Sequence, residues 1–504
     1  MKNTSLKKRI VYNSGWNFLS TISSKIGALI FSIILARFLM PERYGNYSIV
    51  FATAMIFYTF ADLGVNYALS RYLSEASVKN KSQMSPYYRY LLKIKIYLTS
   101  VVFFIILILS YPISVYIFKN SSLFIPFISS AFFVFILSLE VFHSQIFYPI
   151  EKVKYSFIKE LLTQILRIIL VLIVFYMVSQ EYQVFGIFVS LILVHSVILL
   201  LVLFYLKKLA PGIYSTSIGL INKKRVLSVV GFLTIAGISG VFFSYIDSVI
   251  LGIFILPEYV GYYRAAFSFI VGLTALVSFP NSVLLPFFTK LGKLKTEQLF
   301  NTFFRYTAIL SLPLSFGLLV LGKFFINLLY GESYLSASLP LYFISFLIVP
   351  MAGVATFVSL FSAKEKPQIF TKLMIATSII NIILNLVFIK ILLRFSPLWA
   401  TAGAGIATLI SWSFYFIASF YSSKKEFAIN ISMSPIIKPL ISSFLMFILL
   451  MFIKLHFDSL NLFKAIIIIL IGVIFYFLIM ILIKGITKED INLFKNFLKE
   501  PHHT

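Results

Sequence analysis

Charged side chains stand inside three stretches of this sequence that are otherwise apolar. Lys25, Arg167 and Asp247 each lie within a run of about 20 mostly apolar residues, the length that crosses a bilayer. A charge is costly there, usually faces a partner or a water-filled cavity, and indicates a functional site by default. Lysine and arginine suit a phosphate, because both donate charge-assisted hydrogen bonds to its oxygens. Lys25 and Arg167 are therefore candidates to bind a phosphate within a membrane.

Small and polar residues share one face of the first apolar stretch with Lys25. At helical spacing they are Asn13, Asn17, Ser20, Thr21, Ser24, Lys25, Ala28 and Ser32. Small residues alone would favour helix packing, but the added lysine favours a cavity lining. Lys25 lies roughly 22 Å along the helix from the basic N-terminus, too deep to snorkel comfortably. We predict that Asn17, Ser24 and Lys25 bind the substrate, with Lys25 on its phosphate. The alternative is a buried ion pair between Lys25 and Asp62.

A matching stripe of small and polar residues lies in the second half of the chain. It consists of Thr234, Gly237, Gly240, Ser244 and Asp247. The charge of Asp247 again favours a cavity lining over plain helix packing. Ser244 and Asp247 are therefore further candidate binding residues.

Other charged residues fall within or beside predicted spans. Glu140 lies 12 residues before, and Arg167 15 residues after, the turn near Lys152. Their depths therefore differ by only about 4–5 Å of helix rise. The two are candidates either for a structural ion pair or for cavity charges. Arg264 lies just inside the end of its span, where it either guards the exit or snorkels to the surface. Asp62 completes the set of candidate binding residues.

The composition of the chain requires a membrane. Of its 504 residues, 60% are hydrophobic and 12% are charged, whereas a soluble domain carries roughly 25% charged residues. The net charge of +26 comes from lysines and arginines in short loops, which argues against nucleic acid as a partner. The lack of cysteine excludes thiolate metal sites and cysteine nucleophiles. The sequence also has no GxxxxGK[ST] loop for ATP and no HExxH motif for metal-assisted hydrolysis.

Apolar windows predict about fourteen transmembrane helices. The expected spans are 11–38, 44–70, 91–117, 123–148, 157–178, 184–206, 227–254, 260–286, 303–327, 339–361, 370–392, 398–420, 436–456 and 463–483. With the N-terminus inside, 32 lysines and arginines fall in inner segments and 9 in outer ones, the asymmetry that cytoplasmic loops show. Both termini are therefore expected in the cytoplasm. The basic N-terminus is expected to begin a retained first span, not a cleaved signal peptide.

A motif recurs in the sequence at a constant offset of 216 residues. Residues 33–51 and 249–267 are identical at eight of nineteen positions, including a P-E-x-x-G-x-Y core. Each core predicts a tight outer hairpin. Proline ends one helix, glutamate is stabilised by the positive dipole at the start of the next helix, and glycine allows close backbone packing. The repeat predicts two six-helix lobes, 1–210 and 211–425, related by an axis along the membrane normal. Two further helices and a cytoplasmic tail follow in 426–504.

The sequence around this motif resembles a known group of transporters. A first helix that ends in LARFLMPERYGNYS, followed by FADLGVNYALSRYLSE, resembles the oligosaccharide flippases of the multidrug/oligosaccharidyl-lipid/polysaccharide exporter superfamily. The later segment YIDSVILGIFILPEYVGYYRAA is similar to the second-lobe pattern of the same family. The resemblance covers residues 1–420 or so. It implies a V-shaped, two-lobed helical protein that moves undecaprenyl- or dolichyl-linked oligosaccharides to the outer leaflet.

We therefore predict an all-α transporter of the cytoplasmic membrane that flips a polyprenyl-pyrophosphate-linked oligosaccharide for surface polysaccharide assembly, by rocking of its lobes. The expected partners are the lipid-linked oligosaccharide, membrane lipids and the polysaccharide polymerase machinery. The last two helices are candidates to receive the polyprenyl tail. No cofactor is expected, and coupling to a proton, to sodium or to the membrane potential stays open.

Three alternative functions make different demands on the sequence. A cation-coupled multidrug exporter should line its cavity with acids, and a lipid II flippase should have a first lobe richer in arginine. An O-antigen polymerase or ligase, which is an enzyme, should carry one large outer loop. The fourteen spans leave no room for such a loop.

Overall fold

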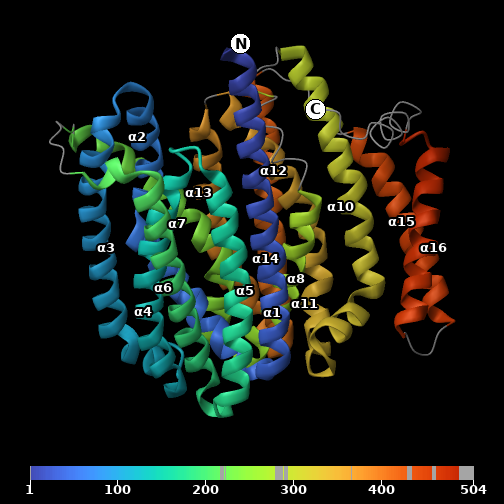
Figure 1. Ribbon diagram of the computed structural model, residues 1–504. Coiled ribbons are helices and arrows are strands. Elements are labelled where there is room, and N and C mark those ends of the chain that lie inside the picture. Colours follow the sequence, from blue (N-terminus) through green and yellow to red (C-terminus); the bar gives the residue numbers. More distant parts are fainter. Residues whose placement is uncertain are drawn as a thin grey trace. The chain divides into compact units, whose positions relative to one another are not determined.

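The computed structural model describes residues 2–215, 221, 223–278, 288, 293–364, 366–427, 434–456 and 461–486, and every regular element in these ranges is a helix (Figure 1). The described α-helices are α1 (Lys2–Asp62), α2 (Val65–Lys79), α3 (Met84–Pro112), α4 (Phe124–Ser144), α5 (Val153–Met177), α6 (Gln183–Leu209), α7 (Lys223–Phe254), α8 (Pro257–Val277), α10 (Lys293–Tyr330), α11 (Ser338–Ile344), α12 (Ile348–Ala363), α13 (Pro367–Leu393), α14 (Pro397–Phe427), α15 (Ser434–Leu455) and α16 (Leu462–Leu482). Apolar runs form helices in a bilayer because a helix satisfies its own backbone groups. The predicted all-α fold is confirmed.

Two expected spans are joined in the single helix α1. Its backbone turns at Met40, where φ is 59° and ψ is 168°. Pro41 follows, and because proline has no N–H and a fixed φ, it ends one helix and suits the first turn of the next. The same arrangement recurs between α7 and α8, where Pro257 is the first residue of α8. The two repeat cores therefore form two hairpins, which we call hairpin 1 (residues 39–47) and hairpin 2 (residues 255–263).

The helices account for the predicted membrane spans. Twelve helices of the described chain are long and apolar enough to cross a membrane. One of them, Tyr12–Asp62, has 51 residues and contains the turn at Met40, so it supplies two of the expected spans. Helix α5 carries several charges and lies outside the twelve, yet its 25 residues are enough to span a bilayer. Parts of the expected spans at 260–286 and 436–456 lie outside the described residues.

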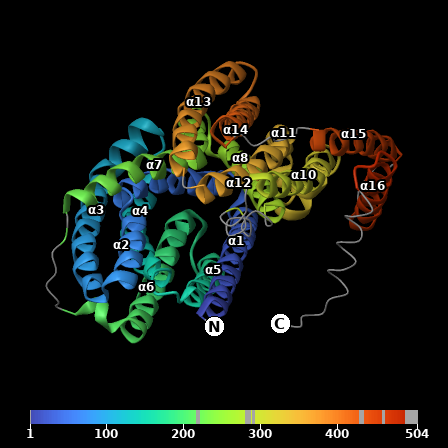
Figure 2. The ribbon, with the colours of Figure 1, turned by 90° about the horizontal axis from the view of Figure 1, so that it is seen from above.

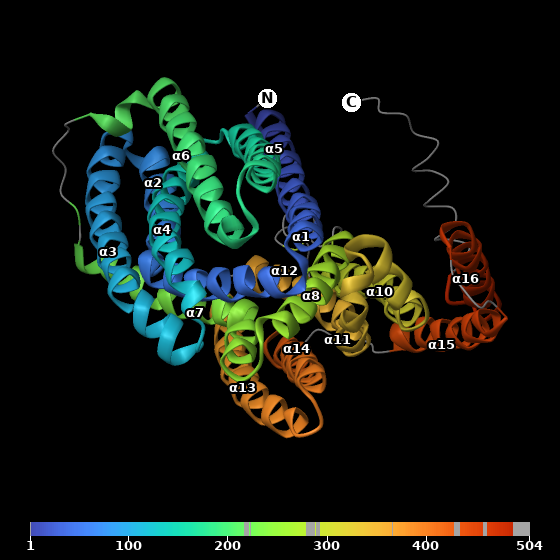
Figure 3. The ribbon, with the colours of Figure 1, turned by 90° about the horizontal axis from the view of Figure 1, so that it is seen from below.

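The chain divides into two compact units, which we describe separately. Unit 1 comprises Met1–Gly272 and Phe370–Ser411. Within it α5 packs between α1 and α6, α4 packs against α3 and α6, and α7 runs along α1 (Figures 2 and 3). This division differs from the lobes 1–210 and 211–425, which rest on the sequence repeat and stay a prediction. All the candidate binding residues with described side chains belong to unit 1.

Unit 2 comprises Leu273–Ile369 and Trp412–Thr504. In it α10 packs against α12 and α15, and α15 pairs with α16. Pro313 lies inside α10 and has no N–H, so it cannot donate to the carbonyl oxygen of Ile309, one turn earlier. The hydroxyl of Tyr476 in α16 donates to that oxygen instead, at 2.9 Å. The ammonium of Lys454 in α15 donates to the Val320 carbonyl at 2.8 Å. These bonds attach the last two helices to α10.

Candidate functional site

The part of α1 that carries Lys25 is open along one face. Among residues 12–30 of α1, only Gly27 is fully buried, and Lys25 is exposed. No described residue forms an ion pair or hydrogen bond with the Lys25 ammonium, which is therefore free for a ligand. Asn17 is exposed and accepts a hydrogen bond from the Tyr148 hydroxyl at 3.2 Å, and Ser24 is half-buried. The predicted binding role of this face stays a prediction.

Asp62 is paired with a lysine, but with Lys95 and not with Lys25. The Lys95 ammonium lies 3.0 Å from Asp62 Oδ1, and the lysine side chain is fully buried. The same oxygen accepts from the backbone N–H of Asn66 at 3.2 Å, at the start of α2. The ion pair between Lys25 and Asp62 is therefore wrong, because α3 supplies a nearer lysine. Asp62 serves the structure at the junction of α1 and α2.

The Glu140 carboxylate is likewise paired with residues other than Arg167, its predicted partner. It is fully buried in α4, and its carboxylate lies 3.0 Å from the Lys159 ammonium and 3.0 Å from Nδ1 of His195. Arg167 lies about two turns beyond Lys159 on α5 and faces α1 instead. The ion pair between Glu140 and Arg167 is therefore wrong, because equal depth does not make two side chains face each other.

Arg167 is half-buried, and two of its donor atoms are buried without an acceptor. Its guanidinium carbon lies 4.4 Å from the centre of the Phe31 ring on α1, a cation–π contact. The Nε and Nη2 atoms are buried and have no hydrogen-bond partner among the described residues. Most buried polar groups in proteins are paired, and a buried unpaired donor costs about 1–3 kcal/mol or more if it is charged. Arg167 therefore has the properties of a ligand-binding residue.

Arg264 contacts aromatic rings near the second half of α1. Its guanidinium carbon is 5.5 Å from the ring centres of both Tyr245 and Phe267. The Tyr245 ring in turn lies 6.0 Å from the Phe51 ring of α1. Arg264 therefore lies beside the second half of α1, and its predicted role at the exit stays a prediction.

Asp247 does not line a cavity. It is almost fully buried, and its carboxylate accepts hydrogen bonds from the Tyr263 hydroxyl at 2.6 Å, the Asn385 amide at 2.8 Å and the Thr408 hydroxyl at 2.8 Å. The predicted cavity-lining position is therefore wrong for Asp247, because donors from α8, α13 and α14 enclose it. Ser244, one turn away, is exposed, with its hydroxyl bonded to the Gly240 carbonyl at 2.9 Å. The side chain of Thr234 lies outside the described residues.

Two asparagines beside Asp247 carry unpaired oxygens. The Oδ1 atoms of Asn381 and Asn385 are buried and without a hydrogen-bond partner among the described residues. The Asn381 amide is 3.5 Å from the Thr408 hydroxyl, which bonds Asp247. Carboxylate, amide and hydroxyl oxygens are the ligands that hard cations prefer. Sequence reasoning missed this group, although two asparagines four residues apart in an apolar helix were a visible signal.

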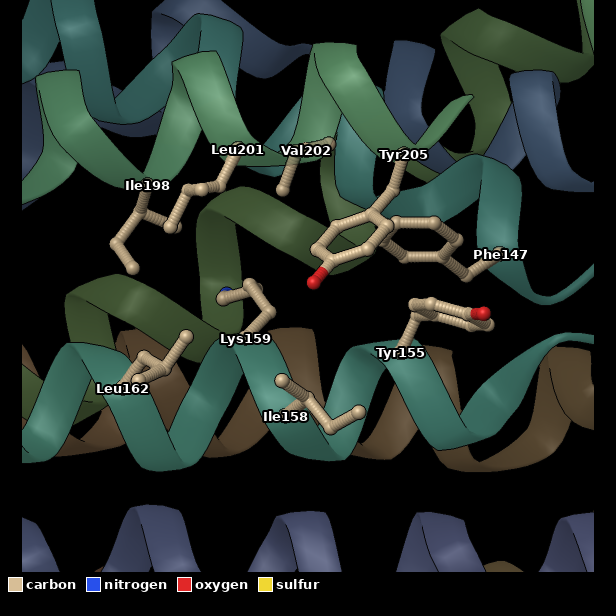
Figure 4. Close-up of a pocket in the computed structure, with 9 residues that line it drawn as sticks. All are labelled: Phe147, Tyr155, Ile158, Lys159, Leu162, Ile198, Leu201, Val202 and Tyr205. Carbon is tan, nitrogen blue, oxygen red and sulfur yellow. The ribbon is translucent and has the colours of Figure 1, made fainter. Parts of the chain in front are cut away.

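A small pocket in unit 1 lies beside Lys159. It is lined by Phe147, Tyr155, Ile158, Lys159, Leu162, Ile198, Leu201, Val202 and Tyr205 (Figure 4). The ring of Tyr155 is 5.0 Å from that of Tyr205 and 5.8 Å from that of Phe147. Because the Lys159 ammonium is already paired with Glu140, this apolar pocket offers no free charge to a phosphate.

The sequence matches a known protein family over more than half of its length. A family model described as polysaccharide biosynthesis protein matches residues 10–292. The chain belongs to this polysaccharide biosynthesis protein family. It is also 22% identical over 227 residues to the probable low-salt glycan biosynthesis flippase Agl15 of Haloferax volcanii. The match covers 41% of this chain and 44% of that relative, so it spans less than half of the relative's length.

The fold of this member of the polysaccharide biosynthesis protein family is similar to that of solved transporters. The lipid II flippase MurJ, in its inward closed conformation, matches with a TM-score of 0.72 and 16% identity over 94% of this chain and 99% of that one. The multidrug transporter DinF-BH matches with a TM-score of 0.59 and 15% identity over 83% of this chain and 95% of that one. At these identities the likeness concerns the fold alone. The chain is thus a multi-pass helical membrane protein, and the predicted family is confirmed.

Proposed function

We propose that this transporter flips a polyprenyl-pyrophosphate-linked oligosaccharide across the cytoplasmic membrane. The observation that carries the proposal is the Arg167 guanidinium, with two buried donors that no described residue satisfies. A pyrophosphate offers several oxygen acceptors, and the planar guanidinium matches phosphate oxygens in a forked geometry. A ligand of this kind would remove the cost of the unpaired donors. The name of Agl15 as a glycan biosynthesis flippase supports the same substrate class.

Arg264 and Lys25 extend the anionic character of the proposed site. Arg264 contacts Tyr245, whose ring lies beside Phe51 of α1, so it would add a second guanidinium next to this helix. Lys25 is exposed on α1, six residues before the Phe31 ring that Arg167 covers. In our proposal Lys25 meets the pyrophosphate first and the arginines hold it deeper in the membrane. The polyprenyl tail stays in lipid, where α15 and α16 are candidates to receive it.

The carboxylates of unit 1 argue against a multidrug exporter of cations. Such an exporter needs acids that face its substrate. Asp62 is paired with Lys95, and Glu140 is paired with Lys159 and His195. Asp247 is buried under three donors. The free charges of the candidate residues are thus positive, which supports an anionic substrate.

We propose further that the group around Asp247 binds the coupling ion, an alkali cation such as sodium. Its support is the buried Asp247 carboxylate with the Thr408 hydroxyl, beside Asn381 and Asn385, whose Oδ1 atoms are buried and unpaired among the described residues. A bound cation would neutralise the carboxylate.

The membrane and orientation of the transporter are part of the same proposal. We place both termini in the cytoplasm, because the expected inner segments hold most of the lysines and arginines. The cysteine-free chain makes labelling of single engineered cysteines unambiguous. Asn80→Cys should react with a membrane-impermeant maleimide only from inside, and Glu181→Cys only from outside. Both residues on one side would contradict the proposed topology. The polysaccharide polymerase machinery is the partner expected to take up the flipped product.

The decisive experiment measures flipping in proteoliposomes loaded with a polyprenyl-pyrophosphate-linked glycan. Arg167→Gln should express and fold normally but lose most flipping, and Arg167→Lys should retain part of it, because a charge remains without the forked geometry. The matched control is Arg43→Gln, since Arg43 bonds the Gln180 side chain and backbone in an exposed loop. Full flipping by a well-folded Arg167→Gln variant would refute the site. Equal flipping of lipid II, or efflux of a cationic dye, would support the alternative transporters.

A further inference from the structure

The two repeat hairpins touch each other through their glycines. A Cβ atom added to Gly45 of hairpin 1 would overlap the carbonyl oxygen of Pro257 and lie 3.1 Å from the amide nitrogen of Gly261. A Cβ atom added to Gly261 of hairpin 2 would overlap the carbonyl oxygen of Pro41 and lie 3.3 Å from the amide nitrogen of Gly45. The contact is reciprocal, and all the obstructing atoms belong to the backbone. Neither position therefore has room for any side chain while the hairpins touch.

The reciprocal contact changes the role that the sequence assigns to the motif. Each of these glycines meets backbone atoms of the opposite hairpin, so its lack of a side chain serves the contact between the two hairpins. The glutamates of the motif do not join the contact: Glu42 is exposed, and Glu258 accepts a hydrogen bond from Tyr262 of its own helix. Within the motif, the glycines and not the glutamates make the contact between the two hairpins.

Helices of the two repeats continue to pack closely beside the hairpins. A Cβ atom at Gly252 of α7 would lie 2.8 Å from Cγ1 of Ile49 in α1, and one at Gly272 of α8 would lie 2.7 Å from Cδ2 of Leu29. Near the start of α7 and the end of α2, the two repeats make a contact of another kind. Arg225 of α7 and Glu75 of α2 form an exposed ion pair at 3.2 Å. Exposed ion pairs contribute little stability. The backbone contact of the hairpins is therefore the stronger of these two attachments between the repeats.

We propose that the contact between Gly45 and Gly261 seals the hairpin end of the transport pathway, and that it must open in each cycle for the substrate to leave. Lysine and arginine place this end outside. Glycine at both positions lets the two backbones touch. This contact lowers the free energy of the sealed state relative to the open state. A side chain at either position disfavours the sealed state without touching the proposed substrate residues, so the population shifts toward an open outer end.

The first test measures access from outside, with no substrate required. A single reporter cysteine replaces the exposed Ser244 of α7. In the parent chain a membrane-impermeant maleimide added outside should label it slowly, and Gly45→Ala or Gly261→Ala should raise the labelling rate about tenfold. The matched control is Gly237→Ala, because no atom lies within 4 Å of a Cβ at Gly237. Equal labelling in a folded Gly45→Ala variant and the control would overturn the proposal.

The second test keeps the proposal falsifiable if Gly45→Ala fails to fold. The Cβ of a cysteine at 252 would lie within about 4.3 Å of that of one at 49, one carbon–carbon bond beyond Cγ1 of Ile49, which suits a disulfide. Ile49→Cys with Gly252→Cys should form this bond on oxidation with copper phenanthroline, lose nearly all transport, and regain it on reduction. Unchanged transport by the cross-linked protein would overturn the proposal. A parent chain that moves no lipid-linked glycan would refute only the proposed substrate, since the labelling test stands alone.

Discussion

Glu140 in α4 and Lys159 in α5 form an ion pair at 3.0 Å in the interior of unit 1. His195 of α6 bonds the other carboxylate oxygen, so three helices meet at one buried acid. Removing one partner of a buried pair leaves an uncompensated charge, which costs about 3–5 kcal/mol, whereas removing both is often nearly neutral. The pair therefore serves to hold α4, α5 and α6 together.

The first prediction concerns this pair and separates it from Arg167. Lys159→Gln and Glu140→Gln should each lower the yield of folded protein, and the double variant should recover most of it. Arg167→Gln should leave the yield unchanged, because no carboxylate depends on it among the described residues. Size-exclusion chromatography of detergent extracts measures the folded fraction. A double variant that folds no better than either single one would contradict the ion-pair role.

Lys25 gives the second prediction. Lys25→Ala should fold normally and lose most glycan export, while Lys25→Arg should retain part of it, because the ammonium is exposed and no described residue pairs with it. Lys425→Ala, exposed in the last turn of α14, is the control for loss of a positive charge. Surface glycan per molecule of transporter is the quantity to measure. Normal surface glycan in the Lys25→Ala strain would count decisively against a role in binding.

The oxygens around Asp247 make the third prediction. Sodium chloride should raise the melting temperature of the purified transporter above that in choline chloride of equal ionic strength, because a ligand that binds the folded state stabilises it. Asp247→Asn should abolish the difference, and Glu181→Gln, in an exposed loop, should leave it intact. A sodium effect of the same size in the Asp247→Asn variant would place the ion elsewhere. A sodium gradient should then speed flipping only when Asp247 is present.

A fourth prediction addresses the attachment of the last two helices. Tyr476→Phe removes the donor to the Ile309 carbonyl and leaves that oxygen without its tyrosine partner. The free energy of unfolding of unit 2 should fall by about 1–3 kcal/mol, as expected for a buried group that loses its partner. Tyr421→Phe is the control, because Tyr421 is 67% exposed. Thermal unfolding in detergent tests this, and equal melting temperatures for the two variants would show that the bond contributes nothing.

The fold was predictable from sequence because a bilayer demands long apolar helices, and the expected spans fall on helices wherever the structure describes them. The side-chain partners within the helix bundle were not predictable. Position along a helix fixes the depth of a side chain, but its direction depends on which helices are neighbours. Glu140 and Arg167 have similar depths, yet α4 packs on α3 and α6 while Arg167 faces α1. Lys95 lies near the start of an expected span, and nothing in its position indicates that it is buried beside Asp62.

Asp247 shows a second limit of sequence reasoning. A lone acid in an apolar helix indicates a cavity only if no other part of the chain supplies hydrogen-bond donors to it. The Asp247 carboxylate receives three such donors, from α8, α13 and α14, up to 161 residues away. The motif glycines show the converse case. Close backbone packing was predictable from residue type, but its partner was not, because a repeat of 216 residues does not say whether its copies meet.

The reciprocity of the hairpin contact bears on how such a chain arises. In an isologous dimer, residue i of one subunit meets residue j of the other and j meets i, so one surface serves both partners. Gly45 with Pro257 and Gly261 with Pro41 follow this rule within a single polypeptide. A half-length ancestor with one P-E-x-x-G-x-Y motif would make the same contact with an identical copy. Gene duplication and fusion would then have joined two subunits that already fitted each other, after which Arg167 and Asp247 diverged in only one half each.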